Sequence, residues 1–226
     1  MKKFIIFSVY FSLIFLLPGS YSHAGVNVNI NLGGSESANY YRSLANYHRV
    51  SEKDVYFVRQ RGIPDEELPV IFYLASLAAV APSIVADEYR RPGITLNDLT
   101  RIFGLNPEIY HYPVKFRVDG PPYGKAYGYY KNKPKKEWKN IKLSNTDIIN
   151  LVNLRFISDS NGVDPEYIIK RRAGGKTFVL INDGIVKEKK LKQSKIKKDF
   201  DHNKPDKGKN GMEKSKGKGK SKGKKK

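Results

Sequence analysis

One stretch of the chain alternates aromatic and basic side chains, and its residue types are those of a binding surface. Tyrosine offers a flat face with a polar tip, glycine permits unusual backbone conformations, and interleaved lysine adds positive charge. Such a combination is typical of surfaces on which sugars, peptides or single-stranded nucleic acid stack. The candidate ligand-binding residues are Tyr123, Lys125, Tyr127, Tyr129, Tyr130, Lys131 and Trp138. The alternative is that these rings cover the ends of a helical core.

Two asparagines in a strongly apolar segment are the second candidate. Asp147, Asn150 and Asn153 recur at every third position and therefore share one face of the helix expected over residues 145–160. Buried amide groups need hydrogen-bond partners. Asn150 and Asn153 therefore bind either the backbone of a neighbouring loop, which we expect, or a ligand.

Metal and thiol chemistry have no support in the sequence. The chain contains no cysteine, which excludes disulfides, thiolate catalysis and cysteine-ligated metals. Beyond residue 24 the histidines are His48, His111 and His202, and none has an acidic or histidine neighbour at metal-ligand spacing. We expect no metal and no cofactor, and we assign no catalytic residue.

Two enzyme motifs are incomplete. Residues 174–177 resemble the end of a phosphate-binding P-loop, but Lys170 stands where that loop requires a glycine. The paired carboxylates at 66–67 and 87–88 are better explained as helix caps or solvated faces. An enzyme that acts on envelope glycan or peptide through carboxylates remains the alternative to a non-enzymatic role.

The helix signals indicate a mainly α fold. Apolar helices are expected over 66–79 and 145–160, and each is followed by a proline at a first helical position, a pair of basic residues and a glycine. Helix starts with the pattern Ser/Thr-x-x-Asp occur at Ser51, Thr95 and Ser144.

The pattern predicts two degenerate helix-turn-helix-like repeats joined by a short β-hairpin or loop. Residues 114–118 of this connection alternate apolar and basic side chains like a strand. A DNA-binding helix-turn-helix is not expected. Its base contacts come from the start of the second helix, whereas Arg171 and Arg172 fall at the end of theirs.

The N-terminus has the features of an export signal. Two lysines precede the fourteen uncharged residues 4–17, and Ser22 and Ala24 place small residues at positions −3 and −1 of a cleavage site. The apolar run is shorter than the roughly 20 residues of a membrane-spanning helix. We expect a signal peptide over 1–24 and a periplasmic or secreted product with no transmembrane segment after cleavage. Chromosomal DNA is then not an expected partner.

More than half of the net charge of +20 lies in the tail. Residues 187–226 hold 18 lysines, no arginine and five acids. They contain too few apolar residues to offset chain entropy, so we expect this tail to be disordered. Its expected partners are anionic envelope polymer or lipid head groups, and the alternative is a solubilising extension. The candidate polyanion-binding residues are Lys216, Lys218, Lys220, Lys222, Lys224, Lys225 and Lys226.

Three sequence runs resemble those of a family of exported proteins of Gram-negative bacteria. They are residues 67–70, 120–131 and 150–156, of which the Gly-Pro-Pro-Tyr-Gly run at 120–124 is the most specific. The resemblance spans roughly residues 50–185. Because that family has no established activity, the resemblance implies location and domain limits only.

These features predict an exported cell-envelope protein that binds or scaffolds without catalysis. Its expected domains are a leader over 25–50, a helical repeat domain over 51–186 and the basic tail over 187–226. A protein or glycan is expected as a further partner. Nucleic-acid binding is a third function class, which depends on the charge and the tyrosines alone.

Overall fold

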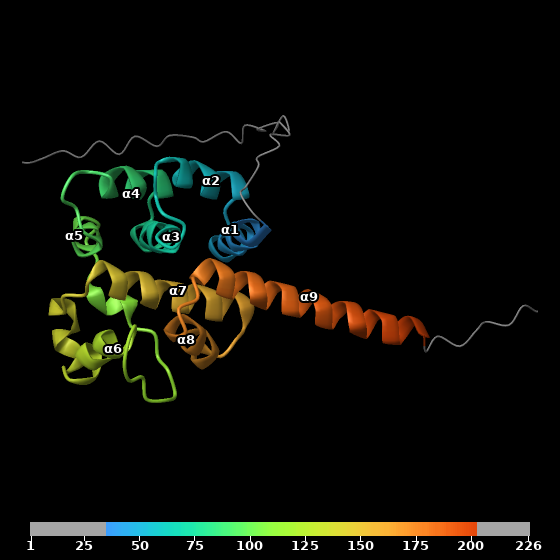
Figure 1. The fold of residues 1–226 in the computed structure, drawn as a ribbon. Coiled ribbons are helices and arrows are strands. Elements are labelled where there is room, and N and C mark those ends of the chain that lie inside the picture. The colour runs from blue at the N-terminus through green and yellow to red at the C-terminus, as the bar shows by residue number, and fades with distance from the viewer. Residues whose placement is uncertain (1–34, 203–226) are drawn as a thin grey trace, which may run out of the picture. The chain divides into compact units, whose positions relative to one another are not determined.

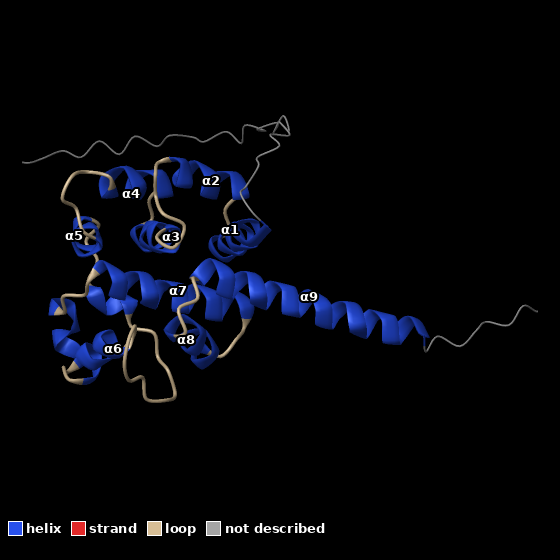
Figure 2. Cartoon of the chain, viewed as in Figure 1, coloured by secondary structure: helices blue, strands red, loops and turns tan. Residues whose placement is uncertain are grey.

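A computed structural model describes residues 35–202 of the chain, with side chains from 36 to 197. The expected signal peptide, the first part of the leader and the lysines from Lys216 to Lys226 lie outside the described residues. Within the described part the chain is helical and contains no strand (Figure 2), in agreement with the mainly α fold.

The helices follow one another with short connections (Figure 1). They are α1 (Ser35–His48), α2 (Glu52–Gln60), α3 (Leu68–Ala78), α4 (Pro82–Tyr89), α5 (Leu96–Ile102), the 3₁₀ helix η1 (Pro107–Tyr110), α6 (Gly124–Lys131), the 3₁₀ helix η2 (Lys135–Asn140), α7 (Asn145–Asn161), α8 (Pro165–Ala173) and α9 (Phe178–His202).

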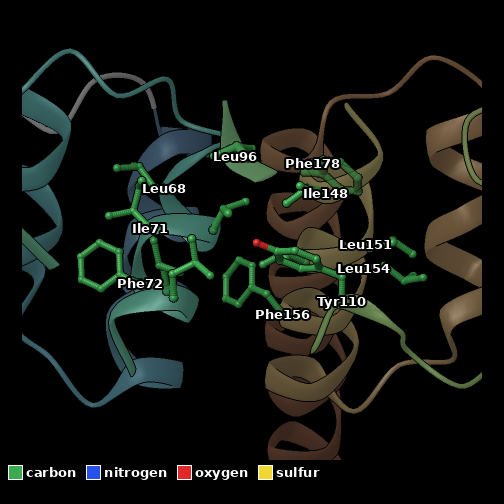
Figure 3. Close-up of a cluster of buried hydrophobic side chains, with 14 of the residues drawn as sticks. Leu68, Ile71, Phe72, Leu96, Tyr110, Ile148, Leu151, Leu154, Phe156 and Phe178 are labelled. Atoms are coloured by element: carbon green, nitrogen blue, oxygen red, sulfur yellow. The ribbon is translucent and has the colours of Figure 1, made fainter. Parts of the chain in front are cut away.

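Helix α7 lies at the centre of the core. It contacts α1, α3, α5, α8, α9 and η1, and eleven of its seventeen residues are buried. Helix α3 packs against α7, and Figure 3 shows Phe156 of α7 pointing towards α3 within one cluster of buried side chains. The apolar side chains of a helix must be covered by other elements, and the neighbours of α7 cover them on several sides.

The helix starts predicted from Ser/Thr-x-x-Asp are confirmed. Ser51, Thr95 and Ser144 each accept a hydrogen bond from the backbone N–H three residues later, and the aspartate there accepts one from the backbone N–H of the cap residue. Each reciprocal pair satisfies two N–H groups that the helix itself cannot bond. A cap of this kind stabilises the helix by about 1 kcal/mol.

The turns after α3 and α7 share one geometry. Ala79 and Gly162 adopt left-handed conformations with φ of 54° and 59°. The N–H of the next residue then bonds a carbonyl five positions earlier, Val80 to Ala75 and Val163 to Ser158, over 3.1 and 3.2 Å. A proline opens the following helix in both cases. The left-handed residue closes one helix, and the proline starts the next at no cost in hydrogen bonds.

Helix α1 belongs to the core, so the helical domain begins before the expected residue 51. Its residues Tyr40, Tyr41 and Leu44 are buried, and α1 contacts α2, α3, α7 and α9. The tyrosines give this segment enough buried surface to dock against the other helices.

The strand expected over 114–118 is wrong, and so is the hairpin alternative for the connection. These residues form a loop, and the residues after the turn form α6. The alternation is nevertheless visible in the loop, where Val114, Phe116 and Val118 are half-buried and Lys115 and Arg117 are exposed. Inward and outward side chains can thus alternate along a loop that has no partner strand.

The first part of the expected disordered tail is helical, because α9 continues to His202. Residues 187–202 contain neither glycine nor proline and are rich in lysine, a good helix former. Extending an existing helix also avoids the unfavourable nucleation step. Residues 203–226 lie outside the described residues. Among the described helices, none combines the length and the apolar character that crossing a bilayer requires.

Shortening a side chain at the centre of α7 should destabilise the whole fold. Leu151 is fully buried, whereas Leu180 on α9 is 50% exposed. Leu151→Ala is expected to lower the free energy of unfolding by about 2–5 kcal/mol, through lost burial and the cavity that remains. Leu180→Ala is the matched control and should change it by no more than about 0.5 kcal/mol. Denaturant unfolding followed by circular dichroism measures both, and equal losses would contradict the central position of α7.

His48 should make the fold sensitive to acid. Burial lowers the pKa of His48 to about 4, and its ring packs against those of Tyr47 and Phe72, with centroids 4.9 and 5.7 Å away. The unfolded chain therefore binds this proton near pH 6.5 and the folded chain only near pH 4. Burial of neutral His48 therefore contributes fully to the stability of the fold above about pH 6.5. As the pH falls towards 4, the free energy of unfolding decreases by on the order of 2 kcal/mol after allowance for solvent.

His48→Phe should remove this part of the pH dependence, because phenylalanine does not titrate. The measurement is the difference between the unfolding free energies of wild type and variant across pH 4 to 7. A difference that stays constant over this interval would show that the buried imidazole does not carry the effect.

Candidate functional site

A groove of about 540 Å³ lies between α6 and the loop that precedes it. This volume is within the range of roughly 300–1,000 Å³ of small-molecule sites. The loop is the long connection before α6 in Figure 1. The groove is lined by His111, Pro113, Val114, Phe116, Arg117, Val118, Asp119, Gly124, Tyr127, Gly128, Lys131 and Asn132.

One face of α6 forms the floor of the groove. Gly124, Tyr127, Gly128 and Lys131 are spaced i, i+3, i+4 and i+7, which places them on the same side of a helix. A Cβ atom on Gly124 would lie 3.1 Å from the backbone carbon of Asp119, so any other residue here would require the loop backbone to shift. A Cβ atom on Gly128 would meet no atom within 4 Å. The space above Gly128 is therefore open.

The loop forms the opposite wall. Its half-buried side chains Val114, Phe116 and Val118 line the groove. Arg117 and Asp119 form an ion pair of 2.7 Å between a guanidinium nitrogen and a carboxylate oxygen. The groove thus combines an apolar wall with charged groups at its edge.

A cluster of aromatic rings supports the groove from below. The His111 ring lies 4.5 Å from that of Trp138, 5.0 Å from that of Tyr130 and 6.3 Å from that of Tyr127, between ring centroids. Burial lowers the pKa of His111, and the positive charges of Arg155 and Lys135 lower it further. The imidazole is therefore held in its neutral form at neutral pH.

Hydrogen bonds fix the rings of this cluster in place. The Tyr130 hydroxyl donates to the Pro107 carbonyl over 2.7 Å, and the Tyr127 hydroxyl donates to the Tyr112 carbonyl over the same distance. The indole N–H of Trp138 donates to the Lys133 carbonyl over 3.0 Å. These bonds join η1, α6 and η2 into one unit that holds the groove.

The structure separates the predicted tyrosine and lysine residues into three groups. Tyr123 and Tyr130 are buried in the core. Tyr127 and Lys131 line the groove. Lys125 is exposed beside it, while Tyr129 and Trp138 are half-buried. Only Tyr127 and Lys131 of the predicted set thus line the groove, and several other rings pack into the core, as the structural alternative expects.

Asn153 is bonded to protein groups on all sides. Its amide N–H groups donate to the carbonyls of Glu66 and Ile149 over 2.7 and 2.8 Å, and its oxygen accepts from the Tyr40 hydroxyl. Asn153 therefore binds the backbone of the loop before α3, as expected from the sequence, and neither Asn153 nor Asn150 lines the groove.

Asn150 belongs to a second polar junction, built around Arg172. The Asn150 oxygen accepts from Nε of Arg172 over 3.3 Å, and the same guanidinium bonds the Glu66 carboxylate at 3.1 Å. The N–H of Phe178, at the start of α9, also donates to Glu66 over 2.6 Å. In the described part of the chain, the Asn150 amide nitrogen and the Tyr123 hydroxyl are buried without a hydrogen-bond partner.

Three carboxylates share a different pocket. Asp65, Glu66 and Glu67 line a pocket of about 520 Å³ with Arg172 and other residues. Asp65 pairs with Arg59 over 2.8 Å, Glu66 pairs with Arg172, and burial raises the pKa of Glu67. The groove beside Tyr127 has one carboxylate, that of Asp119. Within the described residues, no group of His, Asp and Glu could hold a metal ion.

Positive charge is concentrated around the groove. Residues 113–142, which we name the basic lobe, hold nine basic and two acidic residues, a net charge of +7. All nine basic side chains are exposed. The folded residues 35–186 have a net charge of only +5 in total, so the other helices are slightly acidic. The net charge of the whole domain does not indicate this basic lobe. The net charge of a 30-residue window of the sequence does.

Comparison of the chain with family models, with curated proteins and with solved structures gave no significant match.

The two buried asparagines should contribute unequally to stability. Asn153→Ala leaves the Tyr40 hydroxyl and the Glu66 carbonyl without their partner, and each buried group left unpaired costs about 1–3 kcal/mol. Asn150→Ala removes a side chain whose amide nitrogen has no partner, so its loss should be smaller. Chemical denaturation of both variants measures the difference. A larger loss for Asn150→Ala would contradict the structural role assigned to Asn153.

Proposed function

We propose that this chain is an exported, non-enzymatic protein of the cell envelope that associates with anionic polymer through the basic extension of α9. The observation that carries the proposal is the C-terminal part of this helix. All side chains from residue 187 to 197 are exposed, and the segment holds six lysines and one acid. Only Lys187, Glu188 and Lys189 bond to other side chains or to the backbone of the domain. Figure 1 shows this part of α9 extending beyond the other helices.

The distribution of these lysines favours a polymer over insertion into a bilayer. Successive residues of a helix are about 100° apart, so Lys190 and Lys197 lie on one side of the axis and Lys192 and Lys195 on the opposite side. Helices that lie in a membrane interface need one continuous apolar face. The extension has only Leu191 and Ile196 as exposed large apolar residues, and at this spacing they lie on different sides. Lysines on more than one side of the helix can attract a flexible polyanion that wraps around it.

The sequence of the first 24 residues supports export. The alternative of an enzyme with paired carboxylates beside Tyr127 lacks support, because only Asp119 lies there and it pairs with Arg117. Lysine without arginine in the extension also favours general attraction to negative charge over phosphate recognition in nucleic acid.

We further interpret α3–α5 and α7–α9 as two degenerate copies of one helical unit. Both runs have a helix, a turn with one left-handed residue, a helix that starts with proline, and a third helix that begins after a threonine. The basic lobe then lies between the copies, and the third helix of the second copy has gained the basic extension.

Neutralising lysines of the extension should weaken binding to a polyanion. A variant with Gln at Lys190, Lys192, Lys195 and Lys197 keeps the helix and its length and removes four charges. Each lysine near an anionic surface contributes about 1 kcal/mol, so retention on an immobilised acidic polysaccharide should fall at least tenfold at low salt. The same four positions changed to Arg provide the matched control, which should bind like wild type.

Salt should mimic the neutralised variant. At about 0.5 M salt the screening length is well below 10 Å, and wild type should elute like the Gln variant. Equal retention of wild type and the Gln variant at low salt would overturn the proposal. A preference for single-stranded DNA over acidic polysaccharide at equal salt would replace it with nucleic-acid binding.

A further inference from the structure

The basic lobe has the charge of a second binding site that is separate from the extension of α9. Two of its nine basic side chains are in ion pairs, Arg117 with Asp119 and Lys133 with Glu137. For the seven others, the described residues provide no ion-pair partner. These seven are Lys115, Lys125, Lys131, Lys135, Lys136, Lys139 and Lys142. So many exposed like charges in 30 residues repel one another, and an anionic ligand would relieve that repulsion.

The groove lies among these basic residues and limits the shape of a ligand that could bind there. Lys131 lines the groove at the end of the α6 face, and Arg117 lines it from the loop. Between them lie the apolar wall with Phe116 and the open space above Gly128. A ligand that fits must therefore combine an uncharged unit of moderate size with negative groups on either side.

From this combination we propose that the basic lobe binds an acidic polysaccharide, with one sugar unit seated in the groove and its acidic groups at Lys131 and the neighbouring lysines. A sugar ring presents C–H faces to Phe116 and Tyr127. Its hydroxyl groups meet the polar groups of His111 and Asn132, which line the same groove. The carboxylates of adjacent units then lie near exposed ammonium groups.

Other anionic ligands fit the groove less well. An acyl chain would leave the imidazole of His111 and the amide of Asn132 without partners, and unpaired polar groups are costly to bury. Nucleic acid is commonly bound by arginine forks and by rings with open faces. The single arginine of the lobe already pairs with Asp119, and the rings of Tyr130 and Trp138 pack against each other, 5.0 Å apart.

Gly128 gives the proposal a specific test. An interior glycine makes a helix less stable than an alanine does, by about 0.5–1 kcal/mol. No neighbouring atom prevents a side chain at position 128. A leucine here would fill the groove without changing the charge of the lobe. Gly128→Leu therefore separates binding in the groove from general attraction to lysine.

Trp138 reports on this site alone, because it is the only tryptophan of the chain and its ring contacts those of His111 and Tyr130. The experiment is a titration of the full chain with an oligogalacturonate, followed by tryptophan emission. Wild type should show a saturable change, and Gly128→Leu should weaken the apparent affinity at least tenfold. Lys131→Gln, an exposed substitution at the end of α6, should weaken it several-fold and provides a second test that removes one charge without filling the groove.

Controls separate this site from the extension of α9. The variant with Gln at Lys190, Lys192, Lys195 and Lys197 should keep the emission change, even where it loses retention on the polymer. A neutral malto-oligosaccharide should give no change. Circular dichroism checks that each variant is folded.

Three results would overturn the proposal. They are no saturable change in wild type, equal titrations of wild type with both Gly128→Leu and Lys131→Gln, and a response to oligo(dT) in place of the oligogalacturonate. None of these results depends on the extension of α9. The function proposed for that extension is tested separately, by retention on an acidic polymer.

Discussion

Helix α7 is covered by other elements over most of its length, and each polar side chain buried there requires a hydrogen-bond partner. Asn153 meets the requirement through the loop before α3 and the hydroxyl of Tyr40. Asn150 meets it in part through Arg172, which in turn bonds Glu66 and so connects to the start of α9. A few buried amides thereby determine how α1, the loop before α3, α8 and α9 fit around one helix. Hydrogen bonding at these points selects one arrangement among the many that apolar packing alone would allow.

Local features of the fold were predictable from the sequence, and long-range features were not. The caps at Ser51, Thr95 and Ser144 depend on residues three positions apart, so the pattern alone identifies them. The role of Tyr40 depends on Asn153, which is 113 residues away, and no local pattern indicates such a pairing. For that reason the sequence placed α1 in a leader. Similarly, the alternation over 114–118 identifies which side chains point inward but not whether a partner strand exists.

The candidate site was predicted in composition but not in arrangement. The sequence identified the tyrosines and lysines of residues 123–131, and the structure places some of these rings in the core and leaves Tyr127 and Lys131 at the groove. The other wall comes from the loop, whose residues were assigned to a strand. His111 was considered only as a metal ligand, although it lies at the centre of the ring cluster. Glycine spacing at 124 and 128 was the available signal, since glycines four apart leave one face of a helix open.

The continuity of α9 has a mechanical consequence. Its first residues, including Phe178, Ile181 and Ile185, are buried against the core, and the same helix continues without a break into the exposed basic extension. If the extension is attached to a large polymer, a pull on it is transmitted along the helix axis and loads the contacts of α9 with α1 and α7 in shear. Many contacts then share the load at once, whereas a flexible linker would peel away from its anchor one residue at a time.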